Sequence, residues 1–110
     1  NNLLYYSQKE VLPMLQTVND ARRMLTPVFD QYGVSKAVLF GSVAKGTATA
    51  KSDLDLLVQS DLKGLQFVGL IEAVREAAGM PVDVFDVSHI ERGSLIDREI
   101  QATGVTIYEK

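Results

Sequence analysis

The stretch at 52–58 constrains this chain most, because it places two acidic residues within an otherwise apolar strand-like segment. Asp53 and Asp55 are separated by one leucine. Side chains alternate between the faces of a strand, so both carboxylates project from one face, with Cα atoms about 6.5 Å apart. Leu54 and Leu56 then face a core. Carboxylates side by side repel, and each raises the proton affinity of the other, so the pair needs a compensating cation.

A second segment of the same character follows at 81–87, where Asp83 lies between Val82 and Val84. If this strand lies beside the first, Asp83 joins Asp53 and Asp55. Hard oxygen ligands favour Mg²⁺ or Mn²⁺. Three carboxylates can hold two such ions about 3.5–4 Å apart, a spacing that suits in-line displacement at phosphorus. Asp83 would then also accept the proton of an attacking hydroxyl.

Asp86 is a rival to Asp83 for the third carboxylate, although it stands nearer the end of the same strand. Ser52, just before the paired aspartates, has two readings. It caps or turns the chain into the strand, or its hydroxyl orients Asp53. Ser52 is also a candidate residue for binding phosphate.

Gly41-Ser42 follows the apolar strand segment 34–40 and precedes a helical turn around Val43-Ala44. Glycine permits close approach of the backbone to a phosphate, and the free N–H groups at the start of a helix favour an anion. The Ser42 hydroxyl can donate to a phosphate oxygen, and Lys45 supplies a positive charge nearby. The segment is not a P-loop, because that motif requires lysine after its second glycine, where this chain has Thr47.

Periodicity and breaker residues predict the order helix, strand, strand, helix, strand, helix, strand. A Ser7-x-x-Glu10 capping box opens an N-terminal helical segment at 7–27, and Pro27 restarts a short helix that ends at Gly33. The later helices are expected at 65–78 and 94–102, and the strands at 34–40, 54–58, 81–87 and 105–108. Helix 65–78 is long enough to cross between neighbouring strands. These elements predict an α/β (α+β) fold, a small mixed β-sheet with helices packed on one face.

The bulk properties bound the class of protein. The 110 residues fit one domain, 1–110, with a core at about 28–108. The absence of cysteine excludes disulfides and thiolate metal sites, and apolar runs of about five residues are too short to span a membrane. We therefore expect a cytoplasmic protein. The net charge of −3 argues mildly against nucleic acid as a direct substrate, because a domain that grips nucleic acid by its phosphates usually carries an excess of basic residues.

Gly41-Ser42, ten further residues and then Asp53-Leu54-Asp55 resemble the G-S-x10-D-x-D signature of the DNA polymerase β-like nucleotidyltransferase superfamily. The surroundings resemble its minimal nucleotidyltransferase (MNT) branch over roughly 28–108. This resemblance implies a polymerase β-like fold, with Asp53 and Asp55 as the metal-binding pair and Asp83 as the third carboxylate. It also implies that Gly41-Ser42 is the phosphate-binding turn. Lys45 departs from the pattern, because arginine is commoner there.

The resemblance further implies metal-dependent transfer of a nucleoside monophosphate, AMP from ATP, to a hydroxyl. Members of this branch accompany HEPN-domain partners and act as antitoxins, some by transferring AMP onto a tyrosine of the toxin. Two alternatives stay open. One is an inactive antitoxin or subunit that binds the partner, and the other is an aminoglycoside-type transferase whose site is completed by a homodimer. The sequence leaves the base, the acceptor and the oligomeric state undetermined.

Overall fold

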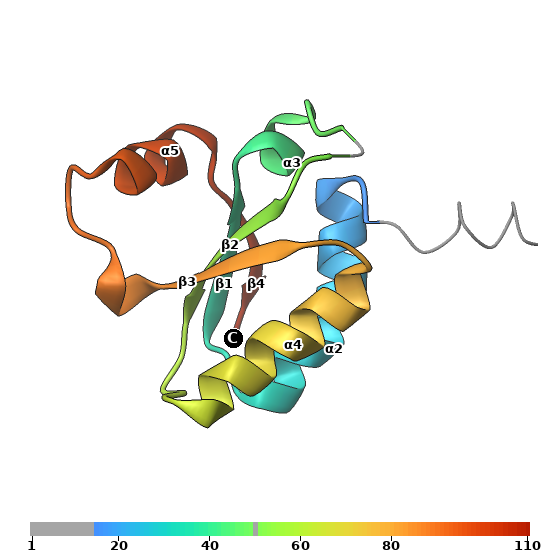
Figure 1. Ribbon diagram of the computed structural model, residues 1–110, viewed down its shortest axis with the longest axis vertical. Coiled ribbons are helices and arrows are strands. Elements are labelled where there is room, and N and C mark those ends of the chain that lie inside the picture. Colours follow the sequence, from blue (N-terminus) through green and yellow to red (C-terminus); the bar gives the residue numbers. More distant parts are fainter. Residues whose placement is uncertain (1–14, 50) are drawn as a thin grey trace, which may run out of the picture.

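The computed structural model describes residues 15–49 and 51–110, which form one four-stranded sheet with helices on both sides (Figure 1). The strands lie in the order β3-β2-β1-β4. Their bounds are β1 (Lys36–Phe40), β2 (Leu54–Gln59), β3 (Val82–Asp86) and β4 (Val105–Glu109). The two long helices, α2 (Val18–Tyr32) and α4 (Leu65–Ala78), pack side by side on one face.

The sheet is mixed, as predicted. β1 pairs antiparallel with both β2 and β4, whereas β2 and β3 are parallel neighbours. Helix α4 connects β2 to β3, because parallel neighbours need a crossover and cannot be joined by a tight hairpin. The prediction that the third strand lies beside the second is thus confirmed, and the two strands begin at the same edge of the sheet.

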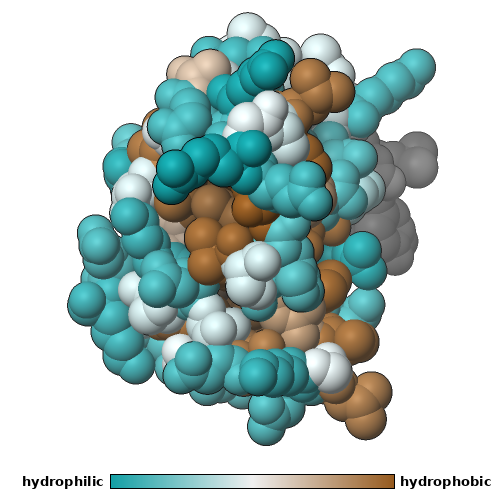
Figure 2. All heavy atoms as spheres, turned by 90° about the vertical axis from the view of Figure 1, so that its left-hand side faces the viewer, coloured by the Kyte–Doolittle hydropathy of each residue, from teal (hydrophilic) through white to brown (hydrophobic). Residues whose placement is uncertain are grey.

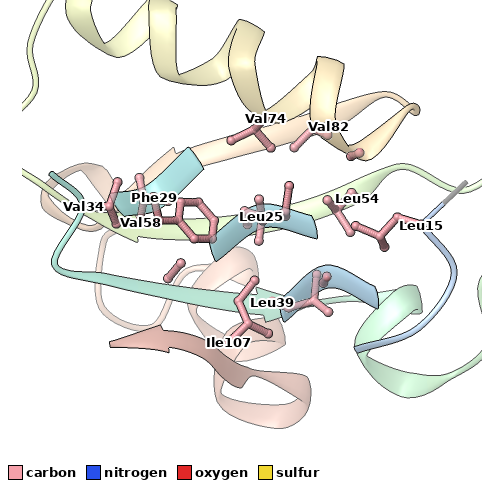
Figure 3. Close-up of a cluster of buried hydrophobic side chains, with 14 of the residues drawn as sticks. Leu15, Leu25, Phe29, Val34, Leu39, Leu54, Val58, Val74, Val82 and Ile107 are labelled. Atoms are coloured by element: carbon pink, nitrogen blue, oxygen red, sulfur yellow. The ribbon is translucent and has the colours of Figure 1, made fainter. Parts of the chain in front are cut away.

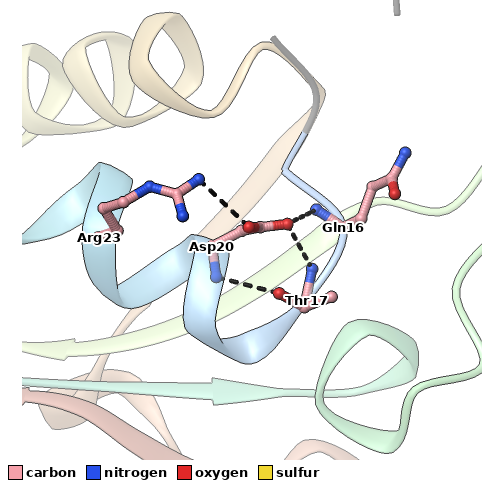
Figure 4. A network of polar contacts seen from close by, with 4 residues as sticks. All are labelled: Gln16, Thr17, Asp20 and Arg23. Carbon is pink, nitrogen blue, oxygen red and sulfur yellow. Dashed lines mark hydrogen bonds and ion pairs between the residues drawn. The ribbon is translucent and has the colours of Figure 1, made fainter. Parts of the chain in front are cut away.

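Helix α2 begins with a capping box that the sequence analysis did not identify (Figure 4). The backbone N–H of Asp20 donates to Thr17 Oγ1 at 3.0 Å, and that of Thr17 donates to Asp20 Oδ2 at 3.1 Å. The N–H of Gln16 also donates to Asp20 Oδ2, and this bond is the main reason why the pKa of Asp20 is lowered. The expected box at Ser7 and Glu10 lies outside the described residues.

The predicted break at Pro27 is wrong, because α2 continues through Pro27 and ends at Gly33. Proline removes one N–H from the helix and normally kinks or breaks it. Here Ala21, Leu25 and Phe29, at four-residue spacing, are all fully buried. This apolar stripe packs on both sides of the proline, so tertiary burial outweighs the local preference.

The core lies between the sheet and the α2–α4 layer (Figure 3). Leu54, Leu56 and Val58 point from β2 into it and are fully buried, as expected from their alternation with Asp55. Burial of a side chain of this size contributes about 1.5–3 kcal/mol, so the inward face of β2 fixes which way the intervening residues point. The outward face of β2 is therefore left for Asp55.

Three short elements complete the described chain: α3 (Ser42–Lys45), the 3-10 turn η1 (Val87–His89) and α5 (Leu95–Thr103). Figure 1 places α5 away from the α2–α4 layer, on the other side of the sheet. Ser94 caps α5 by accepting the N–H of Asp97, at the start of the helix predicted at 94–102. Within residues 15–49 and 51–110, no helix combines the length and the apolar character that crossing a membrane requires.

Candidate active site

Two of the three predicted carboxylates are direct neighbours in the sheet. Asp55 of β2 lies opposite Asp83 of β3 in the parallel register. Neighbouring strands are about 4.8 Å apart, and residues in register share a face, so these side chains are within reach of a common ligand. Asp53 immediately precedes β2, two residues from Asp55. The prediction that the three acids gather at one edge of the sheet agrees with this topology.

Asp55 carries the electrostatic strain of the cluster. Its pKa is raised, first by partial burial and then by the negative charges of Asp83, Asp53 and Glu99. Each of these causes disfavours the ionised form, so a bound cation would stabilise that form. The shift ties Asp53, Asp55 and Asp83 together as one interacting group, and it adds Glu99 to them.

The three aspartates have no protein partners in the described part of the chain. No hydrogen bond or ion pair there satisfies the carboxylate of Asp53, Asp55 or Asp83. Among the described residues, no group of three or more acidic or histidine side chains lies close enough together to hold a metal ion. The backbone places the acids at neighbouring positions, but closer convergence depends on their side chains.

The Gly41-Ser42 turn lies against Asp55. Gly41 has φ 82° and ψ −153°, a region essentially reserved for glycine. A Cβ atom at Gly41 would stand only 2.5 Å from Asp55 Oδ2. Any larger residue would therefore strain the backbone and displace the carboxylate, so glycine is required here both for the turn and for contact with the acid.

Helix α3 starts directly after this turn. Its last turn is closed by Lys45 N–H donating to the carbonyl of Gly41 at 3.0 Å and Thr47 N–H donating to that of Ser42 at 3.0 Å. The first N–H groups of a helix have no partner within the helix, so the start of α3 presents donors beside Asp55. Ser42 is the first residue of α3, and its role in phosphate binding stays a prediction.

Lys45 and Ser52 already have neighbours of their own. Lys45 Nζ is 3.9 Å from Glu99 Oε1, a long ion pair with both side chains about half exposed. The Ser52 hydroxyl accepts the N–H of Thr49 at 2.8 Å. Of its two readings, this bond supports the one in which Ser52 turns the chain into β2. A role in nucleotide binding stays a prediction.

Two residues near the site were missed by the sequence analysis, namely Glu99 and Thr103 of α5. The N–H of Gly41 donates to Thr103 Oγ1 at 2.9 Å, across 62 positions of the chain. Glu99 and Thr103 are four residues apart, so they lie on the same face of α5. Nothing in the sequence, however, indicated that α5 lies beside the Gly41-Ser42 turn.

An apolar hollow opens on the side of the molecule that carries α5 and the β3–η1 connection. Figure 2 shows hydrophobic residues at its floor and hydrophilic residues around it. A hollow of about 530 Å³ on this side is lined by Leu57, Val87, Ile90, Arg92, Asp97, Ile100 and Gln101. Leu57 follows Asp55 by two residues on β2, so the hollow and the carboxylate share one face of the sheet.

Asp86, the rival for the third carboxylate, lies at the opposite end of β3. It pairs in register with Val58, and its Oδ1 accepts the N–H and the hydroxyl of Ser88 at 2.9 and 2.8 Å. These bonds, the backbone bond first, lower its pKa. A second hollow, of about 650 Å³, lies at this end beside Asp86 and His89. It is remote from Asp53 and Asp55, which stand where β2 begins.

Comparison with known proteins identifies the family. Residues 24–110 match the family model described as Polymerase beta, Nucleotidyltransferase. The chain belongs to this family. The nucleotidyltransferase is 32% identical, over 75 residues, to a Methanocaldococcus jannaschii protein named "Putative protein adenylyltransferase", covering 66% of this chain and 81% of that protein. A second protein of the same name and organism is 36% identical over 59 residues, covering 50% and 59%.

Solved structures share its fold. One described as a "putative minimal nucleotidyltransferase" is 25% identical with a TM-score of 0.68, covering 86% of this chain and 97% of that one. A chain of a toxin–antitoxin structure with AMP-PNP gives 0.68 at 18% identity, covering 81% and 73%. A chain of the tri-AMPylated Shewanella oneidensis HEPN toxin in complex with MNT antitoxin gives 0.63 at 14% identity, covering 86% and 74%. These likenesses confirm the predicted polymerase β-like fold.

Proposed function

We propose that this nucleotidyltransferase transfers AMP from ATP to a tyrosine hydroxyl of a HEPN-domain partner and thereby acts as an antitoxin. The observation that carries the proposal is the placement of Asp55 beside Asp83 and against the Gly41-Ser42 turn. Carboxylates and a phosphate-binding turn are the two parts that a phosphoryl-transfer site needs. The carboxylates and the Gly41-Ser42 turn lie together where β2 and β3 begin.

The donor set fits divalent metal. Asp53, Asp55 and Asp83 supply only hard oxygen ligands. Burial is the largest cause of the raised pKa of Asp55, and repulsion by Asp83 and Asp53 raises it further. We propose that these three residues hold two Mg²⁺ or Mn²⁺ ions. Bound there, the ions would neutralise charge on the phosphates and on the attacking oxygen.

The proposed reaction is an in-line displacement. The tyrosine oxygen forms a bond to the α-phosphorus of ATP, the bond from that phosphorus to the bridging oxygen breaks, and pyrophosphate leaves. Asp83 takes the proton of the tyrosine hydroxyl, because it is exposed at the edge strand of the sheet, where an incoming acceptor can reach it. Ser42 and the N–H groups at the start of α3 bind the departing phosphates, with Lys45 nearby.

The hollow beside α5 suits the nucleoside end of ATP. Its floor is apolar, with Leu57 and Ile100, and it lies on the same face of β2 as Asp55. A base can pack there while its triphosphate extends toward the carboxylates. Most of these contacts are non-polar. They favour binding of a purine base but do not distinguish one purine from another.

The HEPN partner is proposed from the relatives. Two curated relatives carry the name of protein adenylyltransferases, and related folds were solved in toxin–antitoxin assemblies. We propose that a partner chain presents the acceptor. We expect that chain to approach the exposed edge at β3.

The test is transfer of label from ATP to the protein encoded beside this one. The purified protein, Mg²⁺ and α-³²P-ATP should label the partner, whereas γ-³²P-ATP should not, because AMP and not the terminal phosphate is transferred. The double variant Asp53→Asn with Asp55→Asn should abolish labelling, and Asp86→Asn is the matched control that keeps it. EDTA should abolish labelling, and Mn²⁺ should restore it.

Three outcomes separate the alternatives. If the double variant still neutralises the partner without labelling it, the protein is a binding antitoxin and the catalytic proposal fails. Labelling of an aminoglycoside in the absence of a partner would favour a small-molecule transferase. Label from γ-³²P-ATP would show phosphorylation and contradict AMP transfer.

A further inference from the structure

Helix α5 is tied to the Gly41-Ser42 turn by one part-buried hydroxyl. Thr103 Oγ1 accepts the N–H of Gly41 at 2.9 Å and donates to the carbonyl of Glu99 at 2.8 Å. The hydroxyl thus uses both its acceptor and its donor capacity. It links the last turn of α5 to the point where β1 becomes the phosphate-binding turn.

The turn needs such a support because of its conformation. Gly41, with φ 82° and ψ −153°, has no side chain to hold it. Glycine is the residue with the largest conformational freedom, so an unsupported glycine turn would sample several orientations. The bond to Thr103 fixes the direction of the Gly41 N–H and with it the Phe40–Gly41 peptide plane, from which the turn toward Ser42 starts.

The end of α5 lies close to β1 at Gly104. A Cβ atom at Gly104 would stand 2.5 Å from the carbonyl oxygen of Ile100 and 3.1 Å from Val38 Cγ1 of β1. There is no room between this end of α5 and β1. At the other end of α3, the pair of Lys45 with Glu99 connects the same helix face to the turn. Thr103 therefore lies on a helix end that packs closely against β1.

We propose that Thr103 is a positioning residue that orients the Gly41-Ser42 turn for the triphosphate of the nucleotide. This inference rests on the proposed nucleotidyl transfer. Thr103 acts through Gly41 and need not touch the substrate. Its hydroxyl holds the turn in the binding conformation before the nucleotide arrives, so binding does not have to order the turn.

The experiment compares Thr103→Val, which keeps the shape and loses the hydroxyl, with Thr103→Ser, which keeps the hydroxyl. Binding of Mg²⁺–AMP-PNP is measured by calorimetry, and exchange of the Gly41 amide proton by NMR. Thr103→Val should weaken binding about three- to tenfold, as expected for one lost hydrogen bond. It should also accelerate exchange at Gly41. Thr103→Ser should stay within about twofold of the unmodified protein in both.

Thermal unfolding separates positioning from general loss of structure. Reversible unfolding would itself raise the apparent Kd, so the melting curve must show that Thr103→Val is fully folded at the temperature of the binding experiment. A higher Kd in a fully folded variant then reports the orientation of the turn. Unchanged Kd in Thr103→Val, equal weakening in both variants, or weakening without faster exchange at Gly41 would each overturn the inference. Intact AMP-PNP binding without labelling of a partner would reject the proposed transfer and leave this inference standing.

Discussion

The carboxylates at the two ends of the β2–β3 strand pair differ in their hydrogen bonding. Asp83 and Asp86 are three residues apart on β3. Asp86 accepts two hydrogen bonds from Ser88, which lower its pKa. Asp83 has none in the described residues, and its charge helps to raise the pKa of Asp55. One end satisfies its acid locally, and the other end gathers several acids without satisfying them.

This difference in hydrogen bonding indicates which carboxylate to consider functional. A carboxylate that caps the following turn stabilises the fold and has little capacity left for a ligand. Acids that repel one another destabilise the fold and persist where a cation or substrate compensates them. By this criterion we propose that the end with Asp53, Asp55 and Asp83 is the reactive one, whereas Asp86 caps the following turn.

The strongest test of the comparison is Asp83→Ala against Asp86→Ala. Asp83→Ala should lower kcat/KM for transfer by at least about 100-fold, because the proposed metal ligand and proton acceptor is lost. Asp86→Ala should keep activity within about threefold, but it should destabilise the protein by about 1 kcal/mol through loss of the Ser88 bonds. Steady-state labelling and urea unfolding measure the two effects. Equal losses of activity in both variants would erase the distinction between the ends.

Gly41→Ala against Gly46→Ala sharpens the comparison at the reactive end. Both glycines have positive φ, 82° and 77°. Alanine costs about 1–2 kcal/mol in the left-handed conformation of Gly46, and more in the conformation of Gly41, which is essentially restricted to glycine. Only at Gly41 would the new Cβ meet Asp55 Oδ2, whereas nothing lies within 4 Å at Gly46. Both variants should therefore lose stability, and only Gly41→Ala should lose transfer, by about 100-fold. Comparable activity in the two variants would show that contact with Asp55 is unimportant.

A smaller effect concerns stability as a function of pH. Ionised Asp55, whose pKa is raised in the folded state, destabilises the fold at neutral pH, and this penalty disappears as the pH falls and the group is protonated. Asp86, whose pKa is lowered, stabilises above its unfolded pKa and loses that contribution as pH falls through its folded pKa. In metal-free buffer, Asp55→Asn should thus raise Tm at pH 7, whereas Asp86→Ala lowers it. A lower Tm for Asp55→Asn would contradict the repulsion.

The smallest expected effect comes from Glu99→Gln. Glu99 is the last of the causes that raise the pKa of Asp55, and it is about half exposed. Activity should decline on acidification as Asp55 is protonated, and Glu99→Gln should move that decline slightly to lower pH. The acid limb of the pH–activity profile measures this shift. A shift to higher pH would show that Glu99 does not act on Asp55 through its charge.

Much of this arrangement was predictable because it is local. The alternation of Leu54 and Leu56 with Asp55 fixed the direction of each side chain, and helix 65–78 was predicted with its observed bounds. The failures arose where tertiary burial overrode a local rule. Pro27 usually starts or breaks a helix, yet the stripe through Leu25 and Phe29 carries α2 across it.

The sequence alone determined which residues could do chemistry, because the spacing of Asp53 and Asp55 sets the face of a strand and glycine sets what a turn can adopt. Only the tertiary structure decided which distant residues support them. The bond from Gly41 to Thr103 spans 62 positions, and no local pattern encodes it. Contacts of this kind depend on how α5 packs on the sheet, which is decided by the burial of surfaces from the whole chain and not by any single segment.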